Sequence, residues 1–419
     1  MRVLKTGTIT AMLCLVCACA ARARNENSLT WRFQGYDDNN HAAVMSHLVR
    51  LVKQVTPFLS VDAGYTTDAV TAASHRHVHG SRERVSEEPE NALKWVDGTT
   101  GATRELRREI DGAVGLTFDI PRRLGAPNPG QNPTRLKLGG IYGTENDYEA
   151  RAASITVEQD LFQRNTTIGA RYLTNDDRIV TDTPFAAPIH AEGEEPAGRK
   201  KRTHTINFLV THGITPRTLG SAVVQYRIDR GYLAHPYHAV RIGDLFYPER
   251  YPRTRSAVVG KGTLKQYVKV LQGMVLDASY RHYRDTWSMR SHTVDAAVFL
   301  RPWKRVGFGP LYRYYRQTSA FFYQDRYASP RRYLSADFRY RRCTTHGLGM
   351  KLFYDVRDFL PPDDLPLFSL FPVGADIQFH VYRRSGPRDE QVLRDRYAYW
   401  PAGDGFRAFW VQTGVRFAF

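Results

Sequence analysis

Apolar and polar residues alternate along many segments of this chain, and the last twelve residues, AFWVQTGVRFAF, show the pattern plainly. Phe409, Val411 and Val415 fall on one parity, whereas Gln412 and Arg416 fall on the other. Successive side chains of a β-strand point to opposite faces of the sheet. The segment is therefore predicted to be a strand with one apolar face and one polar face.

The same alternation recurs at 110–118, 206–211, 222–229, 293–300, 334–341 and 375–382. These runs approach about ten residues, the length that crosses a bilayer at a tilt, whereas strands of soluble sheets average roughly five or six. Asp, Arg, Gln and Gly share the second face in one segment after another. This combination is typical of a lipid-facing wall around a polar lumen.

The predicted fold is all-β, a transmembrane antiparallel up-and-down β-barrel. Closure removes edge strands, which cannot stay unpaired in hydrocarbon, and bacterial barrels have an even strand count. Seventeen segments fit the pattern, so one must be wrong; we expect about 16 strands, with 14 or 18 as alternatives. The segments 29–36 and 346–372 fit least well. The predicted strands are 29–36, 45–54, 58–67, 107–119, 135–144, 152–160, 165–174, 203–212, 219–230, 255–265, 273–283, 290–300, 306–316, 332–341, 346–356, 373–384 and 408–418.

Short connections alternate with long polar ones. The short ones lie at 56–57, 161–165, 213–218, 301–305 and 342–346, and the long ones at 69–106, 173–202, 231–254, 318–330 and 385–407. Short turns on one side of a barrel and long loops on the other are the pattern of outer-membrane proteins. We therefore expect the long connections to be extracellular.

The N-terminus has the features of a secretory signal. Arg2 and Lys5 precede the apolar run TGTITAMLCLVCACA, and Ala18-Cys19-Ala20 fits an A-x-A cleavage site. We expect a signal peptide at 1–20 and a barrel at 21–419, exported to the outer membrane of a Gram-negative cell; lipid attachment at Cys17 or Cys19 is the alternative. The mature chain would then keep Cys343 alone, which excludes an internal disulfide.

The formal net charge of the chain is +17. Export argues against a nucleic acid as partner, so the excess fits anionic headgroups or an Arg-lined pore. We expect outer-membrane lipid and lipopolysaccharide as partners. Phe419 resembles the C-terminal aromatic that the outer-membrane assembly machinery recognises, and Phe417 and Phe419 are the predicted assembly signal. The oligomeric state does not follow from the sequence.

Strand parity predicts which charged side chains face the lumen. They are Arg281, Arg313, Arg339, Arg416, Asp111, Asp277, Asp295, Asp337 and Asp376. One interpretation is an arginine ladder that draws anions through a pore. The other is a structural network of ion pairs, which the many acids on the same face favour.

Other candidate sites are weaker. The alternate histidines His75, His77 and His79 could bind Zn²⁺ or Cu²⁺, or could belong to a polar surface loop. Tryptophans near strand ends are predicted to form a membrane-interface girdle, with ligand stacking as the alternative; they are Trp287, Trp303, Trp400 and Trp410. We find no catalytic motif and expect no enzyme activity and no cofactor.

Several landmarks along the chain carry a family resemblance. They are SVDAGYTTDAVTAAS (60–74), DGTTGATRELRREIDGAVGL (97–116), DLFQRNTTIGARY (160–172), SYRHYRDTWSMRSHTV (279–294) and PLYRYYRQTSAFFY (310–323). The sequence resembles the uncharacterised Gram-negative outer-membrane β-barrels of domain-of-unknown-function family 3570. The resemblance implies an outer-membrane barrel and supplies no activity. The chain departs from the family at 71–74, where TAAS replaces a Ser-Gly-Ala-Ser-like turn.

Two functions are compatible with these features. The first is a porin-like channel or transporter for small solutes with a polar, Arg-rich lumen and a mild anion preference. The second is a plugged, largely structural barrel that serves a surface or export partner as a scaffold without conducting.

Overall fold

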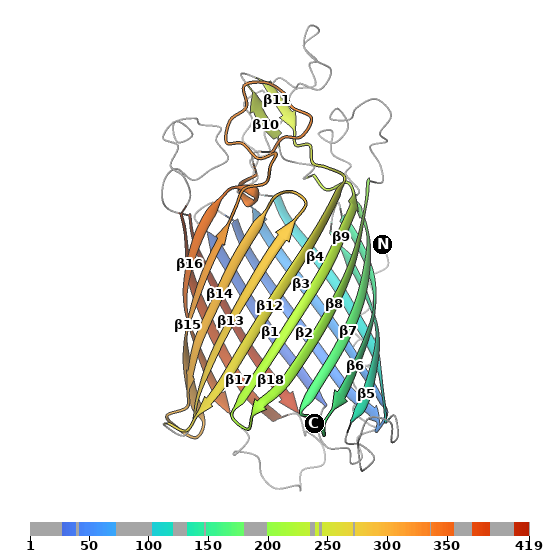
Figure 1. The fold of residues 1–419 in the computed structure, drawn as a ribbon, viewed down its shortest axis with the longest axis vertical. Coiled ribbons are helices and arrows are strands. Elements are labelled where there is room, and N and C mark those ends of the chain that lie inside the picture. The colour runs from blue at the N-terminus through green and yellow to red at the C-terminus, as the bar shows by residue number, and fades with distance from the viewer. Residues whose placement is uncertain are drawn as a thin grey trace.

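Sixteen strands form one closed antiparallel barrel (Figure 1). The computed structural model describes residues 27–38, 42–72, 103–119, 132–145, 148–179, 199–234, 239–242, 245–270, 273–335, 337–355, 371–385 and 406–418. Each strand pairs with its neighbours in the chain, and β1 pairs with β18 to close the sheet, with Ser28 opposite Ala418 and Asp38 opposite Ala408. The predicted up-and-down barrel of 16 strands is confirmed.

The barrel strands run from 11 to 17 residues. Their bounds are β1 Ser28–Asp38, β2 Ala42–Thr56, β3 Leu59–Ala72, β4 Thr103–Asp119, β5 Pro133–Thr144, β6 Tyr148–Leu161, β7 Thr166–Ile179, β8 Arg199–Thr215, β9 Thr218–Gly231, β12 Thr254–Val268, β13 Met274–Asp285, β14 Arg290–Leu300, β15 Val306–Gln317, β16 Cys343–Asp355, β17 Phe371–Ser385 and β18 Phe406–Ala418. Most are longer than the predicted segments, because the hydrogen-bonded ladder continues into polar residues beyond the apolar belt.

The outer face of the barrel is apolar and the inner face is polar. Large apolar side chains stand exposed on the outside; for example Ile110, Phe208 and Leu348 are 59%, 59% and 66% exposed. Most ion pairs between neighbouring strands lie on the opposite parity, as with Arg50 and Asp62. Only lipid makes such an outer surface favourable, and a closed sheet satisfies every strand edge inside it. The barrel therefore spans a membrane.

The two ends of the barrel differ (Figure 1). The turns at 57–58 and 216–217 lie at the end that also holds the last residues of β18, which we call the short-turn end. The connections β3–β4, β7–β8, β9–β12, β15–β16 and β17–β18 lie at the long-loop end. This agrees with the predicted alternation of connections. In the described parts of the chain, no helix is long and apolar enough to cross a membrane.

The predicted strand at 332–341 is wrong. Leu334 and Ser335 are fully buried there, in an extended segment that bridges to Arg250 and Tyr323, and η1 (Phe338–Tyr340) follows. The alternation of apolar residues is real, but it packs a long connection rather than the barrel wall. The predicted turn at 342–346 is wrong for the same reason, since β16 already begins at Cys343. The segment 29–36, which fitted least well, lies within β1.

A folded cap covers the long-loop end above β12 to β16 (Figure 1). It is formed by described residues within 231–254, 285–290 and 318–342, and includes the hairpin β10 (Ala239–Ile242) and β11 (Leu245–Pro248). One buried cluster joins Trp287 and Met289 to Tyr251, Phe322 and their neighbours. A second cluster joins the hairpin to Tyr327 and Leu334. The cap thus has an apolar core of its own, separate from the barrel wall.

Candidate functional site

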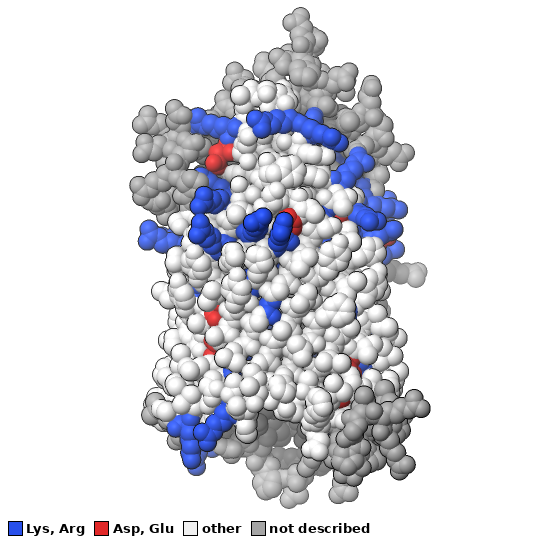
Figure 2. Space-filling model, viewed as in Figure 1, with Lys and Arg blue, Asp and Glu red and all other residues white. Residues whose placement is uncertain are grey.

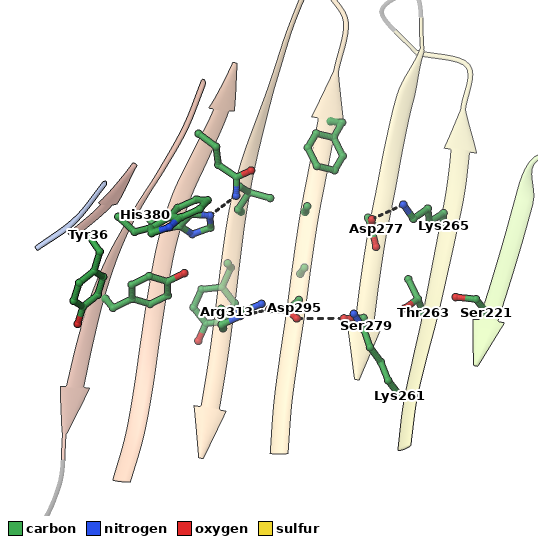
Figure 3. Close-up of a pocket in the computed structure, with 18 residues that line it drawn as sticks. Tyr36, Ser221, Lys261, Thr263, Lys265, Asp277, Ser279, Asp295, Arg313 and His380 are labelled. Atoms are coloured by element: carbon green, nitrogen blue, oxygen red, sulfur yellow. Dashed lines mark hydrogen bonds and ion pairs between the residues drawn. The ribbon is translucent and has the colours of Figure 1, made fainter. Parts of the chain in front are cut away.

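The lumen holds a cavity of about 710 Å³ against the wall that runs from β9 through β12 to β18 and β1 (Figure 3). We call it the middle cavity. Its charged and hydroxyl lining includes Ser221, Lys261, Thr263, Lys265, Asp277, Ser279, Asp295 and Arg313. Residues i and i+2 of a strand share a face, so Lys261, Thr263 and Lys265 form one row on β12. The inward-facing polar residues of successive strands thus form a polar wall.

Ion pairs neutralise only part of this wall. Arg313 Nε donates to Asp295 Oδ1 at 2.5 Å, and Ser279 Oγ donates to Asp295 Oδ2 at 3.3 Å. Lys265 Nζ lies 3.2 Å from Asp277 Oδ2. Lys261 is exposed to the cavity and has no carboxylate partner within the described ranges. Three cations against two carboxylates leave the middle cavity with a net positive charge.

Aromatic rings cluster on the same wall. His380 stacks on Tyr382 with ring centroids 5.6 Å apart, and it contacts Trp410 at 5.2 Å. Gly349 makes room for this, because a Cβ at that position would lie 2.5 Å from His380 Nδ1. The inward glycines of β15 and β16 therefore widen the cavity and present ring faces to it.

A second cavity, of about 620 Å³, lies toward the short-turn end, and we call it the lower cavity. Arg32, Arg301, Lys351 and Arg416 line it together with a single carboxylate, Asp376. Lys351 Nζ lies 3.4 Å from Asp376 Oδ2, which leaves three cations in excess. Arg32 and Arg416 are exposed and have no carboxylate partner in the part of the chain that the structure describes. Phe299 lines both the lower and the middle cavity.

A third cavity, of about 280 Å³, lies beneath the cap and shares Tyr36 and Tyr382 with the middle cavity. Its cations are Arg384 and Arg339, the latter contributed by the cap. Arg339 Nε donates to Asp337 Oδ2 at 2.7 Å. Burial lowers the pKa of Arg339, but the hydrogen bond to Asp337 and the charge of Asp337 together outweigh it, so the pKa is raised overall. We call this the upper cavity. The three cavities follow one wall from the cap to the short-turn end.

The opposite wall, from β2 to β9, is held by close ion pairs. Asp62 accepts from Arg50 and Lys137, each at 2.7 Å. Arg135 reaches Asp160 at 2.7 Å and Glu158 at 3.0 Å. Cations and carboxylates alternate across neighbouring strands in these pairs, so these side chains neutralise one another. The lumen is therefore asymmetric, with a paired wall facing a wall that carries uncompensated cations.

Asp285 anchors the cap to the barrel at the end of β13. Its side chain is fully buried and accepts from Arg255 Nη2 at 2.6 Å and from Tyr283 Oη at 2.7 Å. The backbone amides of Trp287 and Met289 also donate to it, each at 2.9 Å. The Arg255 guanidinium lies 4.4 Å from the Trp287 ring centroid. One carboxylate thus joins the barrel wall to the aromatic core of the cap.

Within the cap, Glu249 and Asp337 are both buried. Ser335 Oγ donates to Glu249 Oε1 at 2.7 Å, and the Asp337 amide donates to the same oxygen at 3.1 Å. The Tyr251 hydroxyl also donates to Glu249. Burial, followed by the charge of Glu249, raises the pKa of Tyr251. This network fixes residues 249–251 against 335–337, so the cap has one defined arrangement over the upper cavity.

A family profile described as "Protein of unknown function (DUF3570)" matches residues 20–360. The chain belongs to this family. The resemblance read from the landmark segments is thereby confirmed. Membership places the chain among proteins without an assigned activity, and no curated protein matches the sequence. The side chains that line the lumen of this DUF3570 barrel are therefore the main indication of its function.

Solved structures with a similar fold are only distantly similar. A bacterial polysaccharide outer-membrane secretin has a TM-score of 0.45 and 10% identity, over 95% of this chain and 100% of its own. OpdK of Pseudomonas aeruginosa, solved with vanillate, has a TM-score of 0.41 and 9% identity, over 94% and 99%. The ferric enterobactin receptor PfeA of the same organism has a TM-score of 0.42 and 8% identity, over 87% of this chain and 54% of its own. Such distant similarity carries no information about a solute.

The structure places each lumen residue expected from the sequence. Arg313, Asp277 and Asp295 line the middle cavity, and Arg416 and Asp376 line the lower one. Arg281 lies on the inward parity of β13, 5.7 Å from the Tyr283 ring, and Asp111 lies 3.9 Å from Arg50 on the paired wall. Arg339 and Asp337 do not belong to a wall strand, since they lie in the cap. The wrong strand assignment at 332–341 is the reason for this difference.

The tryptophans do not share one role. Trp287 is buried in the cap core and Trp410 lines the middle cavity, so the predicted girdle is wrong for these two. Trp303 is exposed in the β14–β15 turn, and Trp400 lies outside the described residues. His75, His77 and His79 also lie outside them; among described residues no group of three potential metal ligands occurs. The signal segment 1–20 lies outside the described residues as well.

Several lumen residues were not singled out from the sequence. Lys261, Lys265 and Arg32 lie on the lumenal parity of their own strands, as Asp277 and Asp295 do on theirs. Applying the parity rule to every predicted strand would have found them. His380 shares the polar parity of Asp376, and Trp410, which was predicted to belong to the girdle, shares that of Arg416, but parity does not show how their rings pack. Their position depends on the glycines of neighbouring strands, which only the strand register reveals.

The end of β18 leads to a prediction about assembly. Phe417 lies opposite Leu29 and Pro372 on the outward parity, next to the lumenal Arg416; Phe419 lies outside the described residues. We expect deletion of Phe419, or Phe419→Asp, to lower the amount of assembled barrel several-fold, because the terminal aromatic is the predicted recognition signal. Arg416→Gln should leave it near normal. Heat-modifiable gel migration of outer-membrane fractions measures this, and equal assembly of all three variants would refute the signal.

Proposed function

We propose that this protein is an outer-membrane channel for small anionic solutes. The carrying observation is the series of three cavities along one wall, which share Phe299, Tyr36 and Tyr382 and each have more cationic than acidic side chains in their lining. A polar lumen with unpaired cations lowers the electrostatic barrier for anions and raises it for cations. Multiple weak sites along the path let a solute leave as readily as it enters.

The difference between the two ends of the barrel supports the proposed place in an outer membrane. In outer-membrane barrels short turns face the periplasm and long loops face the outside. The short-turn end would then be periplasmic, and the cap would cover the extracellular mouth. Solute would enter beside Arg339, pass the row of Lys261, Ser279 and Arg313, and leave past Arg32 and Arg416. No step of this path requires a chemical reaction.

The scaffold hypothesis differs from the channel in one measurable respect. Purified, refolded barrel in a planar bilayer should carry a steady ionic current if it is a channel. In a potassium chloride gradient, the reversal potential should then lie toward the chloride equilibrium potential. A barrel that migrates as folded on gels and gives no current would support the plugged scaffold instead.

A further inference from the structure

Cations gather on the outer surface of the barrel, in a band just beneath the cap (Figure 2). Six exposed residues on the outward parity define what we call the basic belt: Arg178, Lys200, Arg202, Arg230, Arg284 and Arg290. They come from β7, β8, β9, β13 and β14, near the long-loop end of each strand. None of them lines the three lumenal cavities. The belt is therefore a separate feature from the proposed channel.

The belt places like charges directly against one another. Arg178 is the register partner of Lys200, Arg202 of Arg230, and Arg284 of Arg290. Cross-strand partners on one face have Cβ atoms about 4.5–5.5 Å apart, and like charges at that distance destabilise a sheet. Three such pairs at the same end of the barrel therefore need a compensating negative charge.

The described residues supply little of that charge. Arg202 Nη2 lies 3.5 Å from Asp176 Oδ2, with both side chains more than half exposed. The other five belt residues form no ion pair within 4.0 Å with a carboxylate in the described ranges. Glu149 is the register partner of Arg178 on β6, but its carboxylate pairs with Arg151 at 2.6 Å. An exposed pair such as Arg202–Asp176 contributes little to stability, because water screens it. Among the described residues the belt therefore has little compensating negative charge, and an anion from outside the chain would supply it.

The position of the basic belt relative to the membrane interface indicates which kind of anion it meets. Tyr226 and Tyr280 are exposed outward on β9 and β13, and each precedes a belt arginine by four residues, as in YRIDR (226–230) and YRHYR (280–284). Outward tyrosines mark the membrane interface of a barrel. Four residues further along a strand is roughly 14 Å, which reaches the headgroup layer of the outer leaflet. Phosphates are the anions held at that level.

We propose that the basic belt binds the phosphates of lipopolysaccharide-type lipids in the leaflet at the long-loop end. Each cross-strand pair offers guanidinium or ammonium donors from two sides to one phosphate, the geometry that favours charge-assisted binding. The pairs occur on several strands around the barrel, so a layer of lipids, rather than one soluble ion, satisfies them. Clustered cations next to the membrane are attracted to an anionic membrane surface. Bound lipid converts the repulsion within the pairs into stability.

The test uses the double variant Arg230→Gln/Arg284→Gln, which removes one cation from each of two pairs. Wild type and variant are reconstituted in vesicles of phosphatidylcholine alone, or with bisphosphorylated lipid A, or with dephosphorylated lipid A. The melting temperature of the barrel is read from heat-modifiable gel migration. In phosphatidylcholine alone we expect the variant to melt at or above the wild-type temperature, because repulsion is relieved. With bisphosphorylated lipid A we expect the wild type to rise by several degrees and the variant to rise much less.

The controls separate phosphate binding at the belt from a general effect of surface charge or of the acyl chains. Lys269→Gln/Lys304→Gln removes two exposed cations at the short-turn end and should respond to lipid A as wild type does. Inorganic phosphate and dephosphorylated lipid A should not stabilise the wild type. An unchanged wild-type melting temperature with bisphosphorylated lipid A would overturn the proposal, as would an equal gain with inorganic phosphate. Loss of stability by the variant in every vesicle would indicate a purely structural role and would also overturn it.

Discussion

Replacing Arg32 and Arg416 by glutamate should convert the channel from anion-selective to cation-selective. The lower cavity has four cations and one carboxylate in its lining. The double substitution exchanges two cations for two acids and changes its net charge from +3 to −1. Arg32 and Arg416 have no carboxylate partner in the described ranges, so their replacement breaks no ion pair. We expect the anion-to-cation permeability ratio to fall by roughly tenfold or more, a size typical of local electrostatic focusing.

The matched control reverses the same number of charges on the outer face of the barrel. Arg108 and Arg316 lie exposed on the outward parity of β4 and β15. Arg108→Glu/Arg316→Glu therefore alters the protein's net charge equally without touching a cavity. Reversal potentials in a salt gradient compare the two variants. A shift of similar size in both would mean that the selectivity does not arise in the lower cavity.

Asp285→Ala should loosen the cap from the barrel while the barrel itself stays folded. The substitution leaves the Arg255 guanidinium, only 21% exposed, without its carboxylate and removes the acceptor of two buried amides. Breaking a buried pair by removing one partner costs about 3–5 kcal/mol. Hydrogen exchange at the amides of Trp287 and Met289 should then be faster by roughly two to three orders of magnitude. Protease should also cut the cap more readily.

Asp277→Ala provides the comparison on the same strand and the same face. Asp277 pairs with Lys265 at 3.2 Å in the open cavity, where both side chains are partly exposed. A pair of this kind contributes at most about 1 kcal/mol. Cap protection should therefore be unchanged in Asp277→Ala. Equal loss of protection in both variants would show that Asp285 has no special role in holding the cap.

The barrel followed from the sequence because lipid on one side and polar lumen on the other impose a period of two on each wall strand. Arg416 and Phe417 illustrate this, since their neighbouring positions put one in the lower cavity and the other on the outward parity. The same rule failed at 332–341. Leu334 and Ser335 alternate like wall residues, but both are buried because the cap surrounds the segment on all sides. Periodicity identifies an extended segment and does not say what covers each face.

The site was predictable in its parts and unpredictable in its arrangement. Parity placed Asp277, Asp295 and Arg313 on the inward face, but which acid would neutralise which base depends on strand register. Arg313 pairs with Asp295 on the adjacent strand, so it belongs to the structural network of ion pairs. Arg416 has no such partner among the described residues. The division into a paired wall and a cationic wall therefore emerges only when all sixteen strands are in register.

The reversal potential of the wild-type barrel in a planar bilayer with a potassium chloride gradient tests the central claim most directly. The cation excess in the middle and lower cavities predicts a steady current whose reversal potential lies toward the chloride equilibrium potential. Protein that is folded by gel migration and gives no current, or a reversal potential toward the potassium equilibrium potential, would contradict an anion channel.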